Sequence, residues 1–139
     1  MIDKVLIERK IRKIEEFLKE LEAEPLTSLN EFKSNVVKKR FIERNIELAI
    51  EQMVDICKHL VSGLDLKEPE TYAECFESLA GSNIIRVESV AKFQAMVRFR
   101  NMLIHICDGI DDSITYGIYT KHLDDFILFT GQIREFLKK

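Results

Sequence analysis

The sequence predicts an all-α protein built as an up-and-down bundle of five helices. Three observations lead to this prediction. Apolar residues recur near the 3.6-residue period of an amphipathic α-helix through almost the whole chain. No segment alternates convincingly between apolar and polar residues, although residues 113–119 are β-like in composition. The segments between the periodic stretches are short, which is typical of neighbouring helices in a bundle.

The periodic stretches give the five helices in order. The first covers residues 2–21 and ends before Pro25. Ser28 and Glu31 form a possible capping box that opens a long second helix, predicted to end near Val61. Three further helices follow, over residues 70–80, 86–107 and 118–137.

Length and composition indicate one globular domain. The chain has 139 residues, 46% of them hydrophobic and 32% charged, so residues 1–139 are sufficient for a single core. The start, MIDKVLIERKIRK, mixes charged and apolar residues, unlike a signal or transit peptide. No apolar run is long enough to cross a bilayer. Cys57, Cys75 and Cys107 are an odd number without metal-like spacing. They predict free thiols in a cytoplasmic protein. Because no apolar run is long enough to span a bilayer, we also predict no membrane contact.

The charge is unevenly distributed, although the net charge of −3 does not by itself indicate a nucleic-acid binder. Residues 33–44 hold five Lys or Arg against one Glu, and residues 86–105 are also basic. Residues 108–125 are acidic. Solvated helix faces account for such runs, and the charges alone favour that interpretation.

Elimination leaves one unusual polar cluster. The chain has no Gly-rich phosphate loop and no HExxH, and its histidines are too far apart for a helical metal pair. We therefore predict no metal site and no cofactor. The paired aspartates at 111–112 and 124–125 are more simply read as caps and surface. What remains is the cluster Arg98, Arg100, Asn101 and His105.

On an ideal helix Arg98, Asn101 and His105 share one stripe, whereas Arg100 lies about 140° from His105. Arg100 and His105 can share a site if the guanidinium curls round, if the helix distorts, or if a second subunit contributes. The competing interpretation is a satisfied, half-buried histidine beside surface arginines. The residues alone favour that interpretation, because short motifs match by chance.

A resemblance to a known protein family favours the interpretation of this cluster as a functional site. FRNMLIH resembles the Arg-x4-His signature of HEPN-domain proteins. Three blocks resemble the HepT-like branch of that superfamily in their order and spacing, and together they cover nearly the full chain: RFIERNIELAIEQMVDICKHLV, PETYAECFESLAGSNII and FQAMVRFRNMLIHICDGID.

The resemblance implies a HEPN-like five-helix bundle that forms a homodimer through its motif-bearing helices. It also implies a metal-independent ribonuclease toxin, whose antitoxin is a nucleotidyltransferase of the MNT type. Arg100 matches the family arginine, Asn101 the polar residue that often follows it, and His105 the family histidine.

The implied chemistry suits these residue types. The 2′-hydroxyl of RNA can act as an internal nucleophile, and an ordinary imidazole titrates near ~6.5, close to neutral pH. His105 would transfer the proton, and Arg100 would stabilise charge that develops on the phosphate. Arg98 and the two basic segments would contact phosphates away from the reacting bond.

One residue departs from the family pattern. In the HepT branch the motif commonly continues His-x-Tyr, and that tyrosine receives AMP groups from the antitoxin. Here Cys107 occupies the position. Three alternatives follow: another tyrosine takes the modification, with Tyr116 and Tyr119 nearest in sequence; the antitoxin inhibits by binding alone; or the pair has decayed.

Two other functions remain open at this point. The chain can be a non-catalytic module that binds a nucleotidyltransferase and also binds a nucleotide or another substrate of that enzyme. It can also be a structural bundle without a partner. The need for His105 in chemistry separates the ribonuclease from the binding module.

Overall fold

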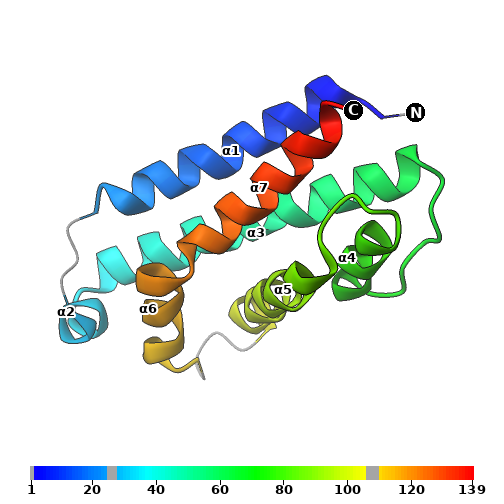
Figure 1. The fold of residues 1–139 in the computed structure, drawn as a ribbon. Coiled ribbons are helices and arrows are strands. Elements are labelled where there is room, and N and C mark those ends of the chain that lie inside the picture. The colour runs from blue at the N-terminus through cyan, green and yellow to red at the C-terminus, as the bar shows by residue number, and fades with distance from the viewer. Residues whose placement is uncertain (1, 25–27, 106–109) are drawn as a thin grey trace.

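The computed structural model describes residues 2–24, 28–105 and 110–139, and it is helical without any strand over those ranges (Figure 1). Seven α-helices and one short 3₁₀ helix occupy them. In chain order these are α1 (Lys4–Glu22), α2 (Leu29–Ser34), α3 (Val36–Gly63), α4 (Tyr72–Gly81), η1 (Val87–Ser89), α5 (Val90–His105), α6 (Asp112–Lys121) and α7 (Leu123–Leu137).

The prediction of an all-α fold is confirmed, but two of the predicted helices are divided. At Asn35 the backbone leaves the helix (φ −103°, ψ 95°), and the side chain accepts a hydrogen bond from the Lys38 amide, 3.0 Å away, to start α3. A second backbone break, at His122 (φ −122°, ψ 8°), separates α6 from α7. The β-like residues 113–119 belong to α6. The helix count is therefore seven in the described part of the chain, rather than five.

Capping side chains set the other boundaries. The Ser28 hydroxyl accepts a hydrogen bond from the Glu31 amide (3.1 Å), as the capping-box prediction required of Ser28. Thr71 caps α4, so this helix starts later than predicted. The segment predicted as a helix over residues 86–107 opens with η1 before α5 begins. Cys107 lies outside the described residues.

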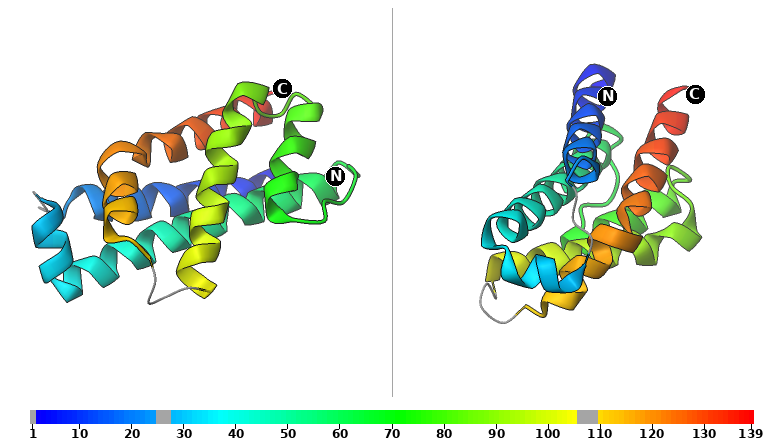
Figure 2. Two further views of the ribbon diagram at one scale, coloured as in Figure 1. Left: turned by 90° about the horizontal axis from the view of Figure 1, so that it is seen from below. Right: turned by 90° about the vertical axis from the view of Figure 1, so that its left-hand side faces the viewer.

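The two longest helices, α1 and α3, lie side by side and antiparallel, and α7 packs against α1 (Figure 1). Helix α5 crosses the direction of α3 steeply instead of running alongside it (Figure 2). The arrangement is therefore an up-and-down bundle only in part. The crossing carries the C-terminal end of α5, which holds the motif, away from the long axis of the other helices.

A continuous hydrophobic core fixes this crossing. Phe93 of α5 packs against Phe129 of α7, with ring centroids 5.2 Å apart, and against Phe76 of α4 at 5.8 Å. All three rings are fully buried. Large buried aromatic rings contribute strongly to core stability, so this cluster anchors α5 to its neighbours.

None of the described helices combines the length and hydropathy that a bilayer crossing needs.

A disulfide joins Cys57 of α3 to Cys75 of α4, so the prediction of free thiols was wrong for these two residues. Both side chains are buried. The odd number of cysteines gave no sign of the pairing, because it depends on how α3 and α4 pack. The bond restrains α4, whose first turn forms one wall of the site described below.

This pairing leads to a first prediction. Denatured but unreduced protein should take up one alkyl group, on Cys107, and reduced protein should take up three. Reduction should lower the free energy of unfolding by about 3 kcal/mol, the value expected for closing a loop of this size. Intact mass and urea titrations measure both quantities. Three alkyl groups without reduction would contradict the pairing.

Candidate active site

The last turn of α5 and the start of α4 enclose a surface hollow of about 620 Å³. The crossing of α5 brings the two segments together although they are distant in sequence. The residues that line the hollow are Glu70, Thr71, Tyr72, Arg100, Asn101, Ile104 and His105. Three of the four predicted site residues therefore meet in one place.

Arg100 is held by three different helices. Its guanidinium Nη2 lies 3.5 Å from the Glu51 carboxylate of α3, and Nη1 donates to the Asn101 side chain at 3.3 Å. Its Cζ atom lies 5.7 Å from the centroid of the Tyr72 ring, within the range of a cation–π interaction. Only 19% of the side chain is exposed. Arg100 is thus a restrained cation at the floor of the hollow.

The Nε atom of Arg100 is buried and has no hydrogen-bond partner among the described residues. Its Nη atoms contact Glu51 and Asn101 on other sides of the group. A guanidinium has five N–H donors in a rigid fork that suits the oxygens of a phosphate. Glu51 and Asn101 each engage one Nη nitrogen, so the guanidinium keeps further Nη–H donors that a bound anion can use.

The position of the guanidinium resolves the helical-wheel question. Arg100 and His105 project from α5 in different directions on an ideal helix, but the long side chain of Arg100 reaches the Asn101 amide. Asn101 lies on the stripe of His105, and all three line the hollow. A single chain therefore brings Arg100 and His105 to one site without a helix distortion or a second subunit.

His105 is exposed at the C-terminal end of α5. Ile104 is itself 38% exposed, and Ile106 lies outside the described residues. The single chain thus leaves His105 open to solvent.

Arg98 is exposed and does not line the hollow, so it is separate from the other three predicted residues. Much of the basic charge in residues 33–44 is engaged inside the fold. Lys38 pairs with Glu24 and Glu31, and Lys39 lies 2.8 Å from Asp112. This segment consequently presents less free positive charge than its composition indicates.

Two residues of the site were not foreseen. Glu51 lies within the predicted second helix and Tyr72 within the predicted third, and neither belongs to the predicted polar cluster. The sequence offers no signal for either role, because their contacts with Arg100 depend on how α3, α4 and α5 pack. In the described part of the chain, no three His, Cys, Asp or Glu side chains cluster in a way that suits a metal ion.

The tyrosines nearest the motif in sequence lie elsewhere. The Tyr119 hydroxyl is 2.8 Å from the carbonyl oxygen of Glu24 and 3.2 Å from that of Leu21, and burial raises its pKa. Tyr116 packs against the ring of Phe32, with centroids 6.0 Å apart. Neither lines the hollow.

Comparison with known proteins identifies the family. A family model described as Ribonuclease HepT-like matches residues 7–133. The chain belongs to the HepT-like ribonuclease family. The resemblance found in its sequence is therefore confirmed over nearly its whole length.

Two relatives of this HepT-like chain carry activity names. It is 26% identical over 136 residues to a protein of Aphanizomenon flos-aquae named tRNA nuclease HepT, covering 98% of this chain and 92% of the relative. It is 25% identical over 105 residues to a protein of Shewanella oneidensis named mRNA nuclease HepT, covering 76% and 79% respectively.

Solved structures show the same fold. A tri-AMPylated HEPN toxin of Shewanella oneidensis, in complex with an MNT antitoxin, superposes with a TM-score of 0.86 at 23% identity, covering 96% of this chain and 99% of that one. The cytosolic protein YutE of Bacillus subtilis superposes with a TM-score of 0.85 at 18% identity, covering 99% and 92%. The helical arrangement of this HepT-like chain is thus shared with the HEPN toxin.

Proposed function

We propose that this protein is the ribonuclease toxin of a toxin–antitoxin pair, that it cleaves RNA in the hollow formed by α4 and α5, and that an MNT-type nucleotidyltransferase restrains it. The family match and the names of the two relatives support the activity. The neighbour solved with an MNT antitoxin supports the partner. The observation that carries the proposal is the meeting of Arg100, Asn101 and His105 in one hollow.

The proposed reaction uses the RNA itself as the nucleophile. The 2′-oxygen attacks the adjacent phosphorus, the bond from phosphorus to the 5′-oxygen breaks, and the products carry a 2′,3′-cyclic phosphate and a 5′-hydroxyl. One proton leaves the 2′-hydroxyl and one joins the departing 5′-oxygen. His105 performs one or both transfers, because imidazole can donate and accept a proton near neutral pH.

Arg100 stabilises the phosphorane-like charge that develops during this step. Glu51 and Asn101 fix the orientation of the guanidinium before RNA arrives, so little reorganisation is needed at the moment of reaction. The Nη nitrogens keep N–H donors beyond the contacts with Glu51 and Asn101. Glu51 and Asn101 are therefore positioning residues, and Arg100 and His105 are the catalytic residues of the proposal.

A homodimer brings two of the proposed sites together. Ile104 and His105 are exposed at the same end of α5, and a second copy packed there would cover Ile104 and bring its own His105 nearby. Two-fold symmetry would then place two Arg100–His105 sets near one bound RNA strand. One histidine would accept the proton while its counterpart donates the other.

A second prediction tests the catalytic residues. His105→Ala and Arg100→Ala should each reduce RNA cleavage by about 10²-fold or more, because each removes a proton-transfer or charge-stabilising group. Helicity should not change. The measurement is cleavage of total RNA by purified protein, with growth of a bacterial host that expresses each variant as a second readout.

Arg98→Ala is the matched control, since it removes an arginine from the same helix outside the hollow. It should weaken RNA binding and reduce its salt dependence while leaving the cleavage rate at saturation unchanged. Cleavage should also survive EDTA, because the proposed reaction assigns every step to side chains. If wild type and His105→Ala cleave equally, the activity belongs to another site, and the non-catalytic binding module becomes the better account.

A third prediction concerns assembly. Light scattering at micromolar concentration should give twice the mass of one chain, and Ile104→Glu should shift the protein toward the monomer by placing a charge in the apolar contact. Val87→Glu is the control, because Val87 is 74% exposed on η1, outside the hollow. A wild-type monomer would contradict both the dimer and the pairing of two Arg100–His105 sets.

A fourth prediction concerns regulation. Incubation with the cognate nucleotidyltransferase and ATP should leave position 107 unmodified, because a cysteine thiol does not replace the phenol. Cys107→Tyr should gain AMP if the partner docks as in the family. Intact mass and peptide mapping distinguish these results. An AMP group on Cys107 would contradict the prediction, and one on Tyr72, Tyr116 or Tyr119 would show that the target has moved.

A further inference from the structure

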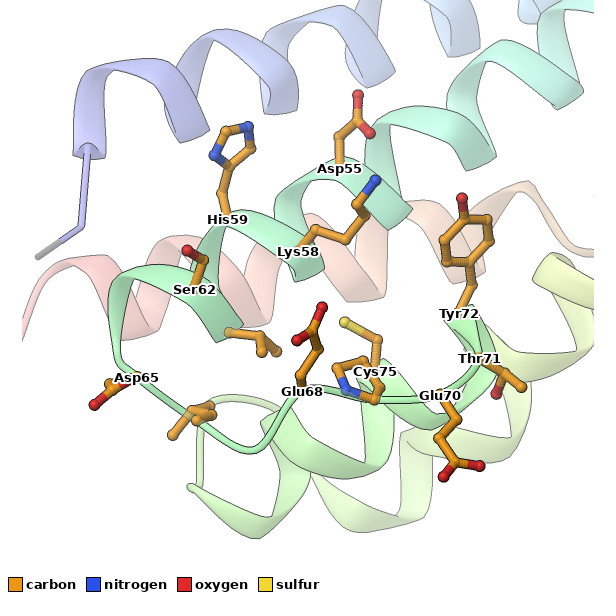
Figure 3. A pocket seen from close by; sticks show the side chains of 13 residues that line it. Asp55, Lys58, His59, Ser62, Asp65, Glu68, Glu70, Thr71, Tyr72 and Cys75 are labelled. Carbon is orange, nitrogen blue, oxygen red and sulfur yellow. The ribbon is translucent and has the colours of Figure 1, made fainter.

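Tyr72 separates two hollows on the surface of the protein. It is the first residue of α4, its side chain is 41% exposed, and it lines the hollow that contains Arg100 and His105. It also lines a second hollow of about 710 Å³, formed by the end of α3 and the loop that leads to α4 (Figure 3). An exposed aromatic ring in this position borders both spaces.

Two cations lie over the Tyr72 ring. The Lys58 Nζ atom is 5.5 Å from the ring centroid, and the Arg100 Cζ atom is 5.7 Å from it. Lys58 comes from the side of the second hollow, and Arg100 from the side of the proposed active site. The ring therefore already contacts cationic groups. Lys58 is exposed, so its side chain can move away from the ring.

The second hollow has the wrong charge for a phosphate. Its rim carries the carboxylates of Asp55, Asp65, Glu68 and Glu70 against the cationic Lys58 and the imidazole of His59. Asp55 is engaged with Lys10 at 3.4 Å. Figure 3 shows the Glu68 side chain directed into the hollow, whereas that of Glu70 points away from it. A carboxylate in this position repels phosphate but accepts hydrogen bonds from the N–H groups of a nucleobase.

We infer that Tyr72 is a stacking platform for the base next to the scissile phosphate, with the edge of that base turned into the second hollow. The inference rests on the proposed function and names the substrate feature that the site takes, an unpaired base of single-stranded RNA. Aromatic side chains bind unpaired bases by stacking. Base stacking on an aromatic ring is stronger than a cation–π contact at an exposed site, so the base displaces Lys58.

The geometry connects this subsite with the reaction. A phosphate bound by Arg100 lies beside the Tyr72 ring, because the guanidinium is already in contact range of that ring. Tyr72 touches the base of the substrate but none of the reacting atoms, so it is a positioning residue. Tyr72 and His105 line the same hollow, so a nucleotide stacked on Tyr72 is bound at the site that holds His105.

The test uses a property of the composition. The chain contains no tryptophan, so Tyr72→Trp introduces a single fluorescent reporter that still stacks. The probe is a short 2′-O-methyl RNA oligonucleotide, which binds but cannot be cleaved because its 2′-oxygen is blocked. We expect its addition to quench the tryptophan fluorescence. An oligonucleotide of the same length built from abasic units should give no quenching.

Val87→Trp is the matched control, because it places one tryptophan at an exposed position outside both hollows. Its fluorescence should not respond to either oligonucleotide. Affinities complete the test: Tyr72→Ala should weaken binding of the 2′-O-methyl probe about tenfold, and Tyr72→Phe should keep it within about twofold, as expected for the loss and retention of one stacked base. Circular dichroism checks that each variant is folded.

The outcomes separate this inference from the proposed activity. Absence of quenching in Tyr72→Trp, or equal affinity of wild type and Tyr72→Ala, would overturn the stacking platform even if RNA is cleaved. Quenching by the uncleavable probe together with a failure of the His105→Ala comparison would keep the platform and reject the nuclease. Equal quenching by the abasic oligonucleotide would show that the backbone, and not a base, occupies the site.

Discussion

Helix α3 is the constraint on which the rest of the structure depends. It is the longest helix and it contacts α1, α2, α4, α5 and α6. Its buried side chains include Ile46, Ile50, Met53 and Ile56. The remaining helices must bury their own apolar faces against it, and this requirement sets where α5 can cross. The position of the motif at the end of α5 is a consequence of that crossing.

The same packing explains why the Arg100 guanidinium is held in place and yet has a nitrogen without a hydrogen-bond partner among the described residues. Glu51 from α3, Tyr72 from α4 and Asn101 from α5 hold its guanidinium in place. The buried Nε atom nevertheless has no partner among the described residues, an arrangement that costs on the order of 1–3 kcal/mol. Unsatisfied buried donors are uncommon in folded proteins and accumulate where a ligand completes them. The N–H groups that remain on the Nη nitrogens suit the oxygens of a phosphate.

The sequence predicts much of the fold because apolar periodicity is a local property. Periodicity locates the long helices, and the capping box locates the cap at Ser28. The motif singles out three of the residues of α5 that line the hollow, Arg100, Asn101 and His105. The breaks at Asn35 and His122 were not predicted, because a polar residue within a helical pattern does not show whether its backbone leaves the helix. These breaks depend on where α2 and α6 pack against each other.

Contacts between helices cannot be predicted from apolar periodicity. Cys57 and Cys75 are 18 residues apart in sequence and on different helices, so their pairing follows only from the packing of α3 against α4. The contact of Glu51 with Arg100 likewise joins residues from α3 and α5. The motif provided two catalytic candidates, whereas the residues that orient them come from the rest of the bundle.

The chemistry of the product ends tests the central claim most directly, because it reports the nucleophile. Mass spectrometry of a short RNA cleaved by the purified protein identifies both ends. Our account predicts a 2′,3′-cyclic phosphate on the upstream fragment and a 5′-hydroxyl on the downstream fragment, as attack by the 2′-oxygen requires. A 3′-hydroxyl and a 5′-phosphate would show that water attacked the phosphorus. That result would contradict the roles assigned to Arg100 and His105.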